Sequence, residues 1–270
     1  MVSLGHDQAA GLRRLFPADP AAAGIVFAGA AGRGPLIAGI ARGLAAAGKQ
    51  VLVIDEQDGA AGAAAAFGLR SRFDLLQAVN RDVPLDKVLL HADDTIRLLP
   101  AARASRQLAR LDAMTRQALD GQLRHLQQGA DYVLTDAALR AGSAATRLLA
   151  QPQRTIVATA TDGASLTETY GQMKRLAQSC DCRRFGCVIL HAANPAAGEA
   201  VFANLREVTR RHLGRELELL GCQTGRSPAK TIGEGLVAAL LLDAPRPRGD
   251  GSIRLSGRPA RHAAAPCPVV

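Results

Sequence analysis

Aromatic residues and lysine are scarce in this 270-residue chain, which contains no tryptophan. Only 3% of the residues are aromatic, so few rings are available on which nucleic-acid bases could stack. The net charge of +9 would otherwise suggest a nucleic-acid partner. However, four of the 33 basic residues are lysines and 29 are arginines, and this bias, together with abundant alanine, is typical of a GC-rich genome. We therefore expect no nucleic-acid partner.

Cysteine is sparse as well, and no apolar run is long enough to cross a bilayer. The five cysteines are odd in number and scattered, which suits a reducing compartment. Cys180-x-Cys182 is too closely spaced for the usual zinc motif, so free thiols are favoured. The first residues also lack the basic and then apolar pattern of a signal peptide. The sequence therefore predicts a cytoplasmic protein with weak membrane association at most.

Three regions of the chain differ in composition. Residues 1–20 form an N-terminal extension, and residues 21–243 carry the periodic apolar pattern of one folded domain. Residues 244–270 are rich in Pro, Gly, Arg and Ala, with five arginines and one aspartate. This composition predicts a disordered basic tail.

Segments that are apolar throughout alternate with amphipathic segments across residues 21–243. We expect strands at 25–28, 51–54, 95–99, 131–136, 154–160, 185–191 and 217–221. We expect helices at 36–47, 72–80, 84–90, 105–129, 141–150, 164–178, 197–213 and 228–242. This alternation predicts an α/β fold, with a mostly parallel sheet covered by helices on both faces.

The first expected strand runs into a glycine-rich turn, and the next strand ends at Asp55. Strand, glycine loop, helix and strand form the βαβ unit that cradles phosphate. In the template G-x-x-x-x-G-K-S/T, Gly29 and Gly34 take the glycine positions, Pro35 takes the lysine position and Leu36 the hydroxyl position. That lysine would meet the phosphates and the hydroxyl would bind Mg²⁺. The turn therefore keeps the backbone of a phosphate loop without its side chains. Alternatively, it is a tight turn that uses glycine for steric reasons and binds nothing.

Two aspartates, Asp55 and Asp136, end expected strands. Ligands of open parallel sheets lie at the carboxyl ends of the strands, and two carboxylates beside a glycine loop suit a Mg²⁺-nucleotide. Aspartate is also common wherever a strand turns into a loop. As a set with the loop, the two acids favour a nucleotide-binding fold, and Asp136 is the candidate metal ligand.

Residues 7–16 predict a short amphipathic helix before the domain. Asp7 favours a helix N-terminus, and Leu12, Leu15 and Phe16 share one face. Gly11 costs about 1 kcal/mol relative to alanine, so this helix would be marginal alone in water. Three alternatives remain open: a docking helix for a partner, a lid on its own domain, or a frayed terminus.

The order of these features resembles the MinD/ParA family of P-loop ATPases, in particular the flagellar-number regulators FlhG and FleN. The resemblance runs from about residue 7 to residue 240, and its segments are 48–55, 69–79, 96–101, 131–136, 165–170, 198–202 and 208–211. Residues 165–170, for example, are similar to the family's S-I-T-D-A-Y segment. The resemblance implies a P-loop NTPase-like fold, ATP and Mg²⁺ as cofactors, and recruitment to the cell pole.

The segment from Asp7 to Arg13 resembles the DQAxxLR helix that FlhG proteins carry ahead of the ATPase domain. In that family the helix stimulates FlhF, a signal-recognition-type GTPase that places flagella. The resemblance therefore implies an FlhF-like partner, contacted through Asp7, Gln8, Leu12, Arg13 and Phe16. Flagellar basal-body proteins and transcription regulators are further partners that it allows.

The departures from the family cluster at the ATP site. The family motif KGGVGK-S/T corresponds to residues 30–36, where both lysines and the hydroxyl are missing. A gap-free placement backward from the second strand instead puts Arg33 at the lysine and Gly34 at the Ser/Thr. The second acid of the family's D-x-D becomes Gln57, and its purine-reading asparagine falls on Leu190. We therefore expect weak binding of ATP and Mg²⁺ at most. The candidate nucleotide-binding residues are Gly29, Gly32, Arg33, Gly34, Asp55 and Asp136.

These observations leave two main hypotheses. The first is a pseudo-ATPase that regulates flagellar number or placement by binding an FlhF-like GTPase through residues 7–16. The second is a divergent but active ATPase that uses Arg33, Asp55 and Asp136, with Asp136 as the catalytic residue. A DNA or membrane-surface binder is less favoured, because the chain lacks aromatic platforms and a clear basic amphipathic helix at its C-terminus.

Overall fold

The computed structural model describes residues 22–139, 152–179, 182, 184–225 and 230–242. Three expected features lie outside these residues: the helix at 7–16, the helix at 141–150 and the basic tail at 244–270.

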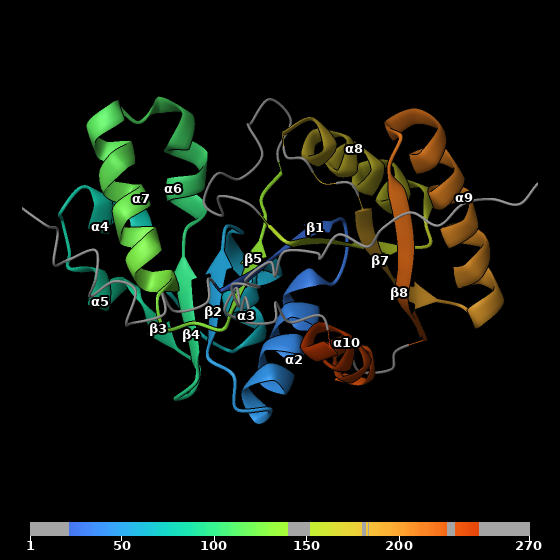
Figure 1. Cartoon of the computed structure of the whole chain (residues 1–270), viewed down its shortest axis with the longest axis horizontal. Coiled ribbons are helices and arrows are strands. Elements are labelled where there is room, and N and C mark those ends of the chain that lie inside the picture. Colours follow the sequence, from blue (N-terminus) through green and yellow to red (C-terminus); the bar gives the residue numbers. More distant parts are fainter. Residues whose placement is uncertain (1–21, 140–151, 180–181, 183, 226–229, 243–270) are drawn as a thin grey trace, which may run out of the picture.

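An eight-stranded sheet runs through the centre of the described chain (Figure 1), in the order β3-β4-β2-β5-β1-β6-β7-β8. The parallel strands are β1 (Ala23–Gly29), β2 (Val51–Asp55), β4 (Ile96–Pro100), β5 (Tyr132–Asp136), β6 (Arg154–Ala160), β7 (Arg184–Ala192) and β8 (Glu216–Thr224). At one edge, β3 (Leu90–His91) pairs with β4 in the antiparallel direction. The predicted mostly parallel sheet is confirmed.

Helices cover both faces of the sheet (Figure 1). On one face lie α2 (Arg33–Ala46), α3 (Ala63–Ala66) and α10 (Lys230–Leu242). On the other lie α4 (Leu75–Val79), α5 (Leu85–Val88), α6 (Ala102–Gln107), α7 (Ala113–Gln127), α8 (Gly163–Ser179) and α9 (Pro195–Leu213). Two short 3₁₀ turns, η1 (Gly59–Ala61) and η2 (Leu108–Arg110), complete the described elements.

Strand β2 shows why the sequence pattern is apolar throughout. Val51 and Val53 pack into the core beneath α2 and α10, whereas Leu52 and Ile54 pack into the core on the other face. All four side chains are fully buried. Because successive side chains of a strand point to opposite faces, a strand covered on both sides must be apolar at every position.

Two local expectations were correct only in part. The single helix expected at 105–129 is interrupted before α7, because Asp112 caps a new helix by accepting a hydrogen bond from the Thr115 N–H at 2.8 Å. The helix expected at 84–90 ends at Val88, since Leu90 instead pairs with Leu98 of β4. In the second case pairing at the sheet edge overrides the local helical pattern.

One buried carboxylate, that of Asp74, joins the N-termini of α4 and α6. It accepts hydrogen bonds from the backbone N–H groups of Leu76 (3.0 Å), Arg103 (2.9 Å) and Ala104 (3.0 Å). The Gln77 side chain accepts one from the Asp74 N–H at 2.9 Å, which completes a capping box. Asp74 therefore fixes the chain at the carboxyl ends of β2 and β4.

We expect Asp74→Ala to lower the free energy of unfolding by about 2–4 kcal/mol, because three backbone donors lose their acceptor in a buried place. Urea denaturation of both proteins measures this loss. Asp112→Ala is the matched control: its exposed carboxylate caps α7 alone, so the expected loss is smaller. Equal losses in the two variants would contradict the joint role of Asp74.

Candidate functional site

The glycine turn between β1 and α2 is tight. A Cβ on Gly29 (φ 110°) would lie 1.9 Å from the carbonyl oxygen of Ala158, so no other residue fits there without a shift. Gly32 adopts a left-handed φ of 55° as the N-cap of α2, and Arg33 is the first residue of that helix. This geometry favours the placement of Arg33 at the lysine position. The turn then reads G-x-x-G instead of G-x-x-x-x-G, which makes it shorter than a phosphate loop.

Two backbone N–H groups at the start of this turn already have protein acceptors. The Gly29 N–H donates to the Gln172 side chain at 2.8 Å. The Ala30 N–H lies 3.2 Å from the Thr169 hydroxyl and 3.1 Å from the Ala158 carbonyl. Both α8 side chains were missed in the sequence, although Thr169 lies in the family-like segment 165–170 and could have been found there.

Arg33 turns back into the site. Its Nε donates to Asp136 Oδ1 at 2.9 Å, and its guanidinium also donates to the Gly29 carbonyl oxygen. The Asp136 side chain is fully buried, and the Arg33 side chain is only 12% exposed. The acid expected to bind a metal is therefore paired with a cation of the chain itself.

Burial raises the pKa of Asp136 to about 7; Arg33 lowers this pKa, and neighbouring Asp55 raises it further. One oxygen of Asp136, Oδ2, is buried and has no hydrogen-bond partner. The site thus holds more buried acid than Arg33 neutralises, and part of this acid is protonated near neutral pH.

Asp55 lies opposite Asp136 in the sheet register. Its Oδ1 accepts the Gln57 N–H at 3.0 Å, and its Oδ2 accepts the Ala64 N–H at 2.7 Å. Burial raises the pKa of Asp55, while these backbone hydrogen bonds and Arg33 lower it. Because both of its oxygens accept backbone hydrogen bonds, Asp55 mainly holds the segment that follows β2.

Glu56 is a third buried acid, and its burial was not predicted from the sequence. Its Oε2 accepts hydrogen bonds from the Ser105 hydroxyl at 3.1 Å and from the Ala138 N–H at 3.0 Å. Its Oε1 is buried without a partner. Burial raises the pKa of Glu56 to about 8, the two hydrogen bonds lower it, and Asp136 and Asp55 raise it. Glu56 is therefore mostly protonated at neutral pH.

The remaining site positions also make contacts within the protein. The Gln57 side chain, which replaces the family's second acid, donates to the Ala137 carbonyl at 2.7 Å. A Cβ on Gly34 would lie 2.7 Å from the Gly62 carbonyl oxygen, and a Cβ on Gly32 would lie 2.6 Å from Leu190 Cδ1. Other parts of the chain therefore pack closely around the glycine turn.

The structure brings together the predicted residues Gly29, Gly32, Arg33, Gly34, Asp55 and Asp136. The predicted partner-binding residues Asp7, Gln8, Leu12, Arg13 and Phe16 lie outside the described chain.

The donor set does not fit Mg²⁺, which takes oxygen ligands in a near-octahedral arrangement. Asp136 Oδ1 is paired with Arg33, both Asp55 oxygens accept backbone N–H groups, and Gly34 has no hydroxyl, so the buried Asp136 Oδ2 is the one unpartnered oxygen of this set. Across the residues that the structure describes, no group of three or more His, Cys, Asp or Glu side chains could hold a metal ion.

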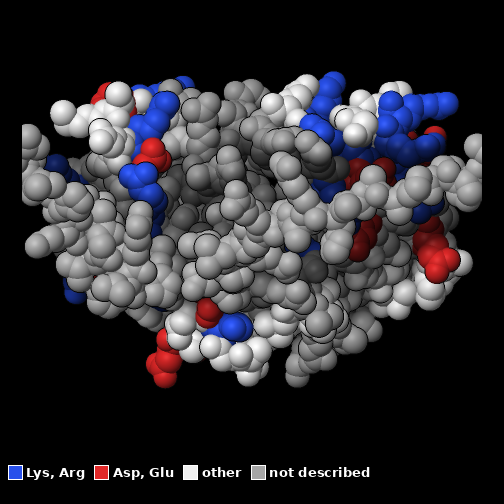
Figure 2. Space-filling view, in the orientation of Figure 1, with Lys and Arg blue, Asp and Glu red and all other residues white. Residues whose placement is uncertain are grey.

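Charged side chains on the molecular surface are mixed in sign. On the face shown in Figure 2, Lys and Arg gather toward two ends of the molecule, with acidic side chains among them. On α9, for example, exposed Arg210 pairs with exposed Glu207 at 2.8 Å. None of the described helices combines the length and the apolar character that crossing a membrane requires.

A curated relative supports the resemblance noted in the sequence. The antiactivator FleN of Pseudomonas aeruginosa is 25% identical over 193 residues, which covers 72% of this chain and 69% of FleN. No family model matches the chain.

Solved structures share the fold. A chain of the MinC:MinD cell division protein complex of Aquifex aeolicus has a TM-score of 0.54 and 20% identity, and the match covers 82% of this chain and 89% of that one. MinD of Pyrococcus horikoshii, complexed with Mg-ADP, has a TM-score of 0.55 and 14% identity, and the match covers 80% of this chain and 95% of that one. Cobyrinic acid a,c-diamide synthase of Mycobacterium smegmatis, with bound ADP and magnesium, has a TM-score of 0.58 and 18% identity. That match covers 82% of this chain and 94% of the synthase chain. The fold is therefore that of a P-loop NTPase of MinD/ParA type.

Proposed function

We propose that this chain, which resembles FleN in sequence and the MinD/ParA-type ATPases in fold, is a regulator of the FleN/MinD type. Its proposed role is the control of flagellar number or placement. The similarity to FleN supports the regulatory role, and the MinD-like fold supports the same class of protein. We further propose that its nucleotide site no longer hydrolyses ATP efficiently, so that it acts by binding partner proteins.

The pairing of Arg33 with Asp136 is the observation that carries the pseudo-ATPase proposal. In a working P-loop site a lysine meets the phosphates, and the acid at the end of the neighbouring strand helps to hold Mg²⁺. Here the arginine at the lysine position instead donates to that acid and to the Gly29 carbonyl. Bound ATP would have to displace these contacts, within a turn whose Gly29 and Ala30 N–H groups already have acceptors.

One observation favours the alternative, a divergent but active ATPase. The buried Asp136 Oδ2 has no hydrogen-bond partner, so this acid retains an oxygen with which a cation could interact. In this alternative Arg33 would leave Asp136 and contact phosphate, while Asp55 and Asp136 would serve the reaction. Measurement of ATP turnover decides between the two functions.

For the partner, we propose an FlhF-like GTPase that is contacted through residues 7–16. Gln8 offers an amide that could orient groups in a partner's active site, and the Arg13 guanidinium could approach phosphate. Leu12, Leu15 and Phe16 would provide the apolar anchor of a helix bound in a groove. The likeness of residues 7–13 to the DQAxxLR helix supports this proposal.

A synthetic peptide of residues 1–20 is expected to accelerate GTP hydrolysis by the cognate GTPase. The expected stimulation is about 10-fold, well below the roughly 10³–10⁵-fold of an arginine finger, because the helix would order the partner's own catalytic groups. Single-turnover GTPase assays measure it, with a peptide carrying Gln8→Ala and Arg13→Ala as the control. If the native peptide leaves GTP turnover unchanged, and Gln8→Ala in the full-length protein has no effect either, the docking proposal is wrong.

A further inference from the structure

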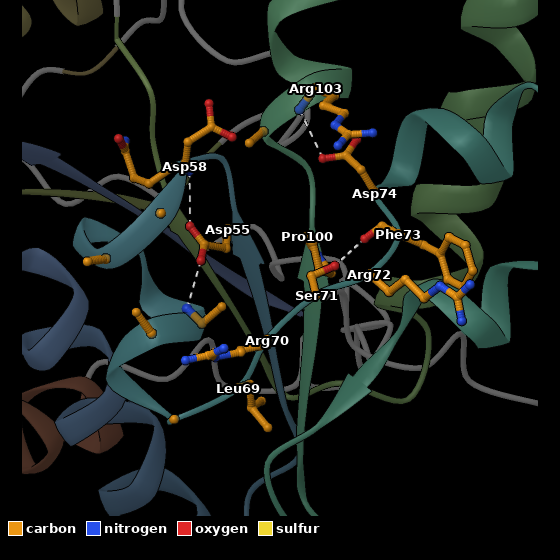
Figure 3. Close-up of a pocket in the computed structure, with 17 residues that line it drawn as sticks. Asp55, Asp58, Leu69, Arg70, Ser71, Arg72, Phe73, Asp74, Pro100 and Arg103 are labelled. Carbon is orange, nitrogen blue, oxygen red and sulfur yellow. Dashed lines mark hydrogen bonds between the residues drawn. The ribbon is translucent and has the colours of Figure 1, made fainter.

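A cavity of about 730 Å³ opens at the carboxyl ends of β2 and β4. Its lining comes from the segment between β2 and α4 and from the beginning of α6 (Figure 3). Of the six candidate nucleotide-binding residues, Asp55 alone lines it, so it lies beside the glycine turn and not within it. Small-molecule sites typically measure about 300–1,000 Å³ and, in open parallel sheets, lie at this edge.

The three acids that line the cavity already have hydrogen-bond or ion-pair partners within the protein. Asp55 accepts two backbone N–H groups, and Asp74 accepts three. Asp58 forms an ion pair with Arg106. Most of their oxygens therefore already accept hydrogen bonds or pair with a cation within the protein, which leaves few of them to bind a cationic ligand.

The three arginines that line the cavity are exposed, and the structure gives their guanidinium groups no ion pair with a described residue. Arg70 and Arg103 extend from different sides of the cavity (Figure 3). Arg72 lies over the Phe73 ring, 5.4 Å from its centroid. A guanidinium presents a planar fork of donors that matches phosphate, so uncompensated arginines around a cavity favour an anionic ligand.

Part of the lining is apolar. Leu69, Phe73, Pro100 and several alanines also line the cavity, at separate places among the charged groups. A bare inorganic anion would leave these groups in contact with water. A ligand with both an apolar body and a phosphate would cover them and meet the arginines at the same time.

We propose that this cavity binds a small organic phosphate, with Arg70 and Arg103 contacting the phosphate and the apolar lining contacting the organic part. The site is additional to the proposed regulatory function and does not depend on ATP binding at the glycine turn. It would let the abundance of a phosphorylated metabolite act on the segment between β2 and α4.

Isothermal titration of the full-length protein with pyrophosphate tests the anion site. We expect saturable binding that weakens by about 10-fold or more in Arg70→Ala/Arg103→Ala. Arg206→Ala/Arg211→Ala is the matched control, because it removes the same charge from exposed positions on α9 and is expected to leave the affinity nearly unchanged. As a second variant that keeps every arginine, Ala65→Glu adds negative charge to the lining and is also expected to weaken binding.

Phenyl phosphate compared with inorganic phosphate tests the organic part. We expect phenyl phosphate to bind several-fold more tightly, because its ring covers apolar lining. Equal affinities would overturn the organic class of ligand. The anion site itself is wrong if pyrophosphate shows no saturable binding, or if the Arg70→Ala/Arg103→Ala variant binds it as well as the native protein. Binding that is lost in Arg33→Ala but kept in that double variant would place the anion at the glycine turn, which also overturns the proposal.

Discussion

Purified protein is expected to turn over ATP no faster than its Asp136→Asn variant, even with saturating ATP and Mg²⁺. The hydroxyl that would bind Mg²⁺ is replaced by Gly34, and the second acid is replaced by Gln57, which instead donates to Ala137. Loss of a single catalytic group typically lowers a rate by about 10²–10³-fold. Because Arg33 is paired with Asp136, the absence of a lysine that meets the phosphates is expected to lower the rate by a comparable factor.

A phosphate-release assay on both proteins measures this turnover, and calorimetric titration with ATP and Mg²⁺ separates weak binding from slow chemistry. Turnover of several ATP molecules per minute that disappears in Asp136→Asn would establish the alternative function. In that case Arg33 would have to leave Asp136 during the reaction, and the pairing in the structure would describe a resting state of an ATPase.

Most of the fold could be predicted because its strands are buried on both faces. A run such as residues 51–54 has no polar position, so it identifies a central strand of a parallel sheet without knowledge of its neighbours. The helix boundary at Asp112 was harder to predict, because residues 105–129 keep a helical pattern on both sides of it. Only the capping contact to Thr115 reveals where one helix ends and the next begins.

In the candidate site, too, some features could be predicted from the sequence and others could not. Gly29 and Asp136 could be identified because strand ends and tight turns restrict residue type locally. The direction of the Arg33 side chain could not, since it depends on an acid 103 positions away in the chain. Glu56 was missed for a similar reason: its environment comes from Ser105 and Ala138, which only the folded sheet brings to it.

The burial of Glu56 makes stability depend on pH in a defined direction. Its pKa is raised from 4.5 to about 8, so between these values the folded protein keeps a proton that the unfolded chain releases. Stability therefore falls as pH rises through this window. The contribution is fully present below about pH 4.5 and lost above about pH 8. Asp136, whose pKa is raised to about 7, changes stability in the same direction.

We expect Glu56→Gln to stabilise the protein increasingly as pH rises, by roughly 3–5 kcal/mol near pH 8 and by little near pH 4. The amide has nearly the same shape and can accept the hydrogen bonds of Ser105 and Ala138, but it has no charge to bury. Urea denaturation across this pH range measures the effect, and Glu199→Gln, at an exposed position on α9, is the control. If the two variants differ from the native protein by the same amount at every pH, Glu56 does not keep its proton in the folded state. Because the native Glu56 lowers stability at neutral pH, partner binding or ATP turnover that is lost in Glu56→Gln would show that this acid acts in function together with Asp136 and Asp55.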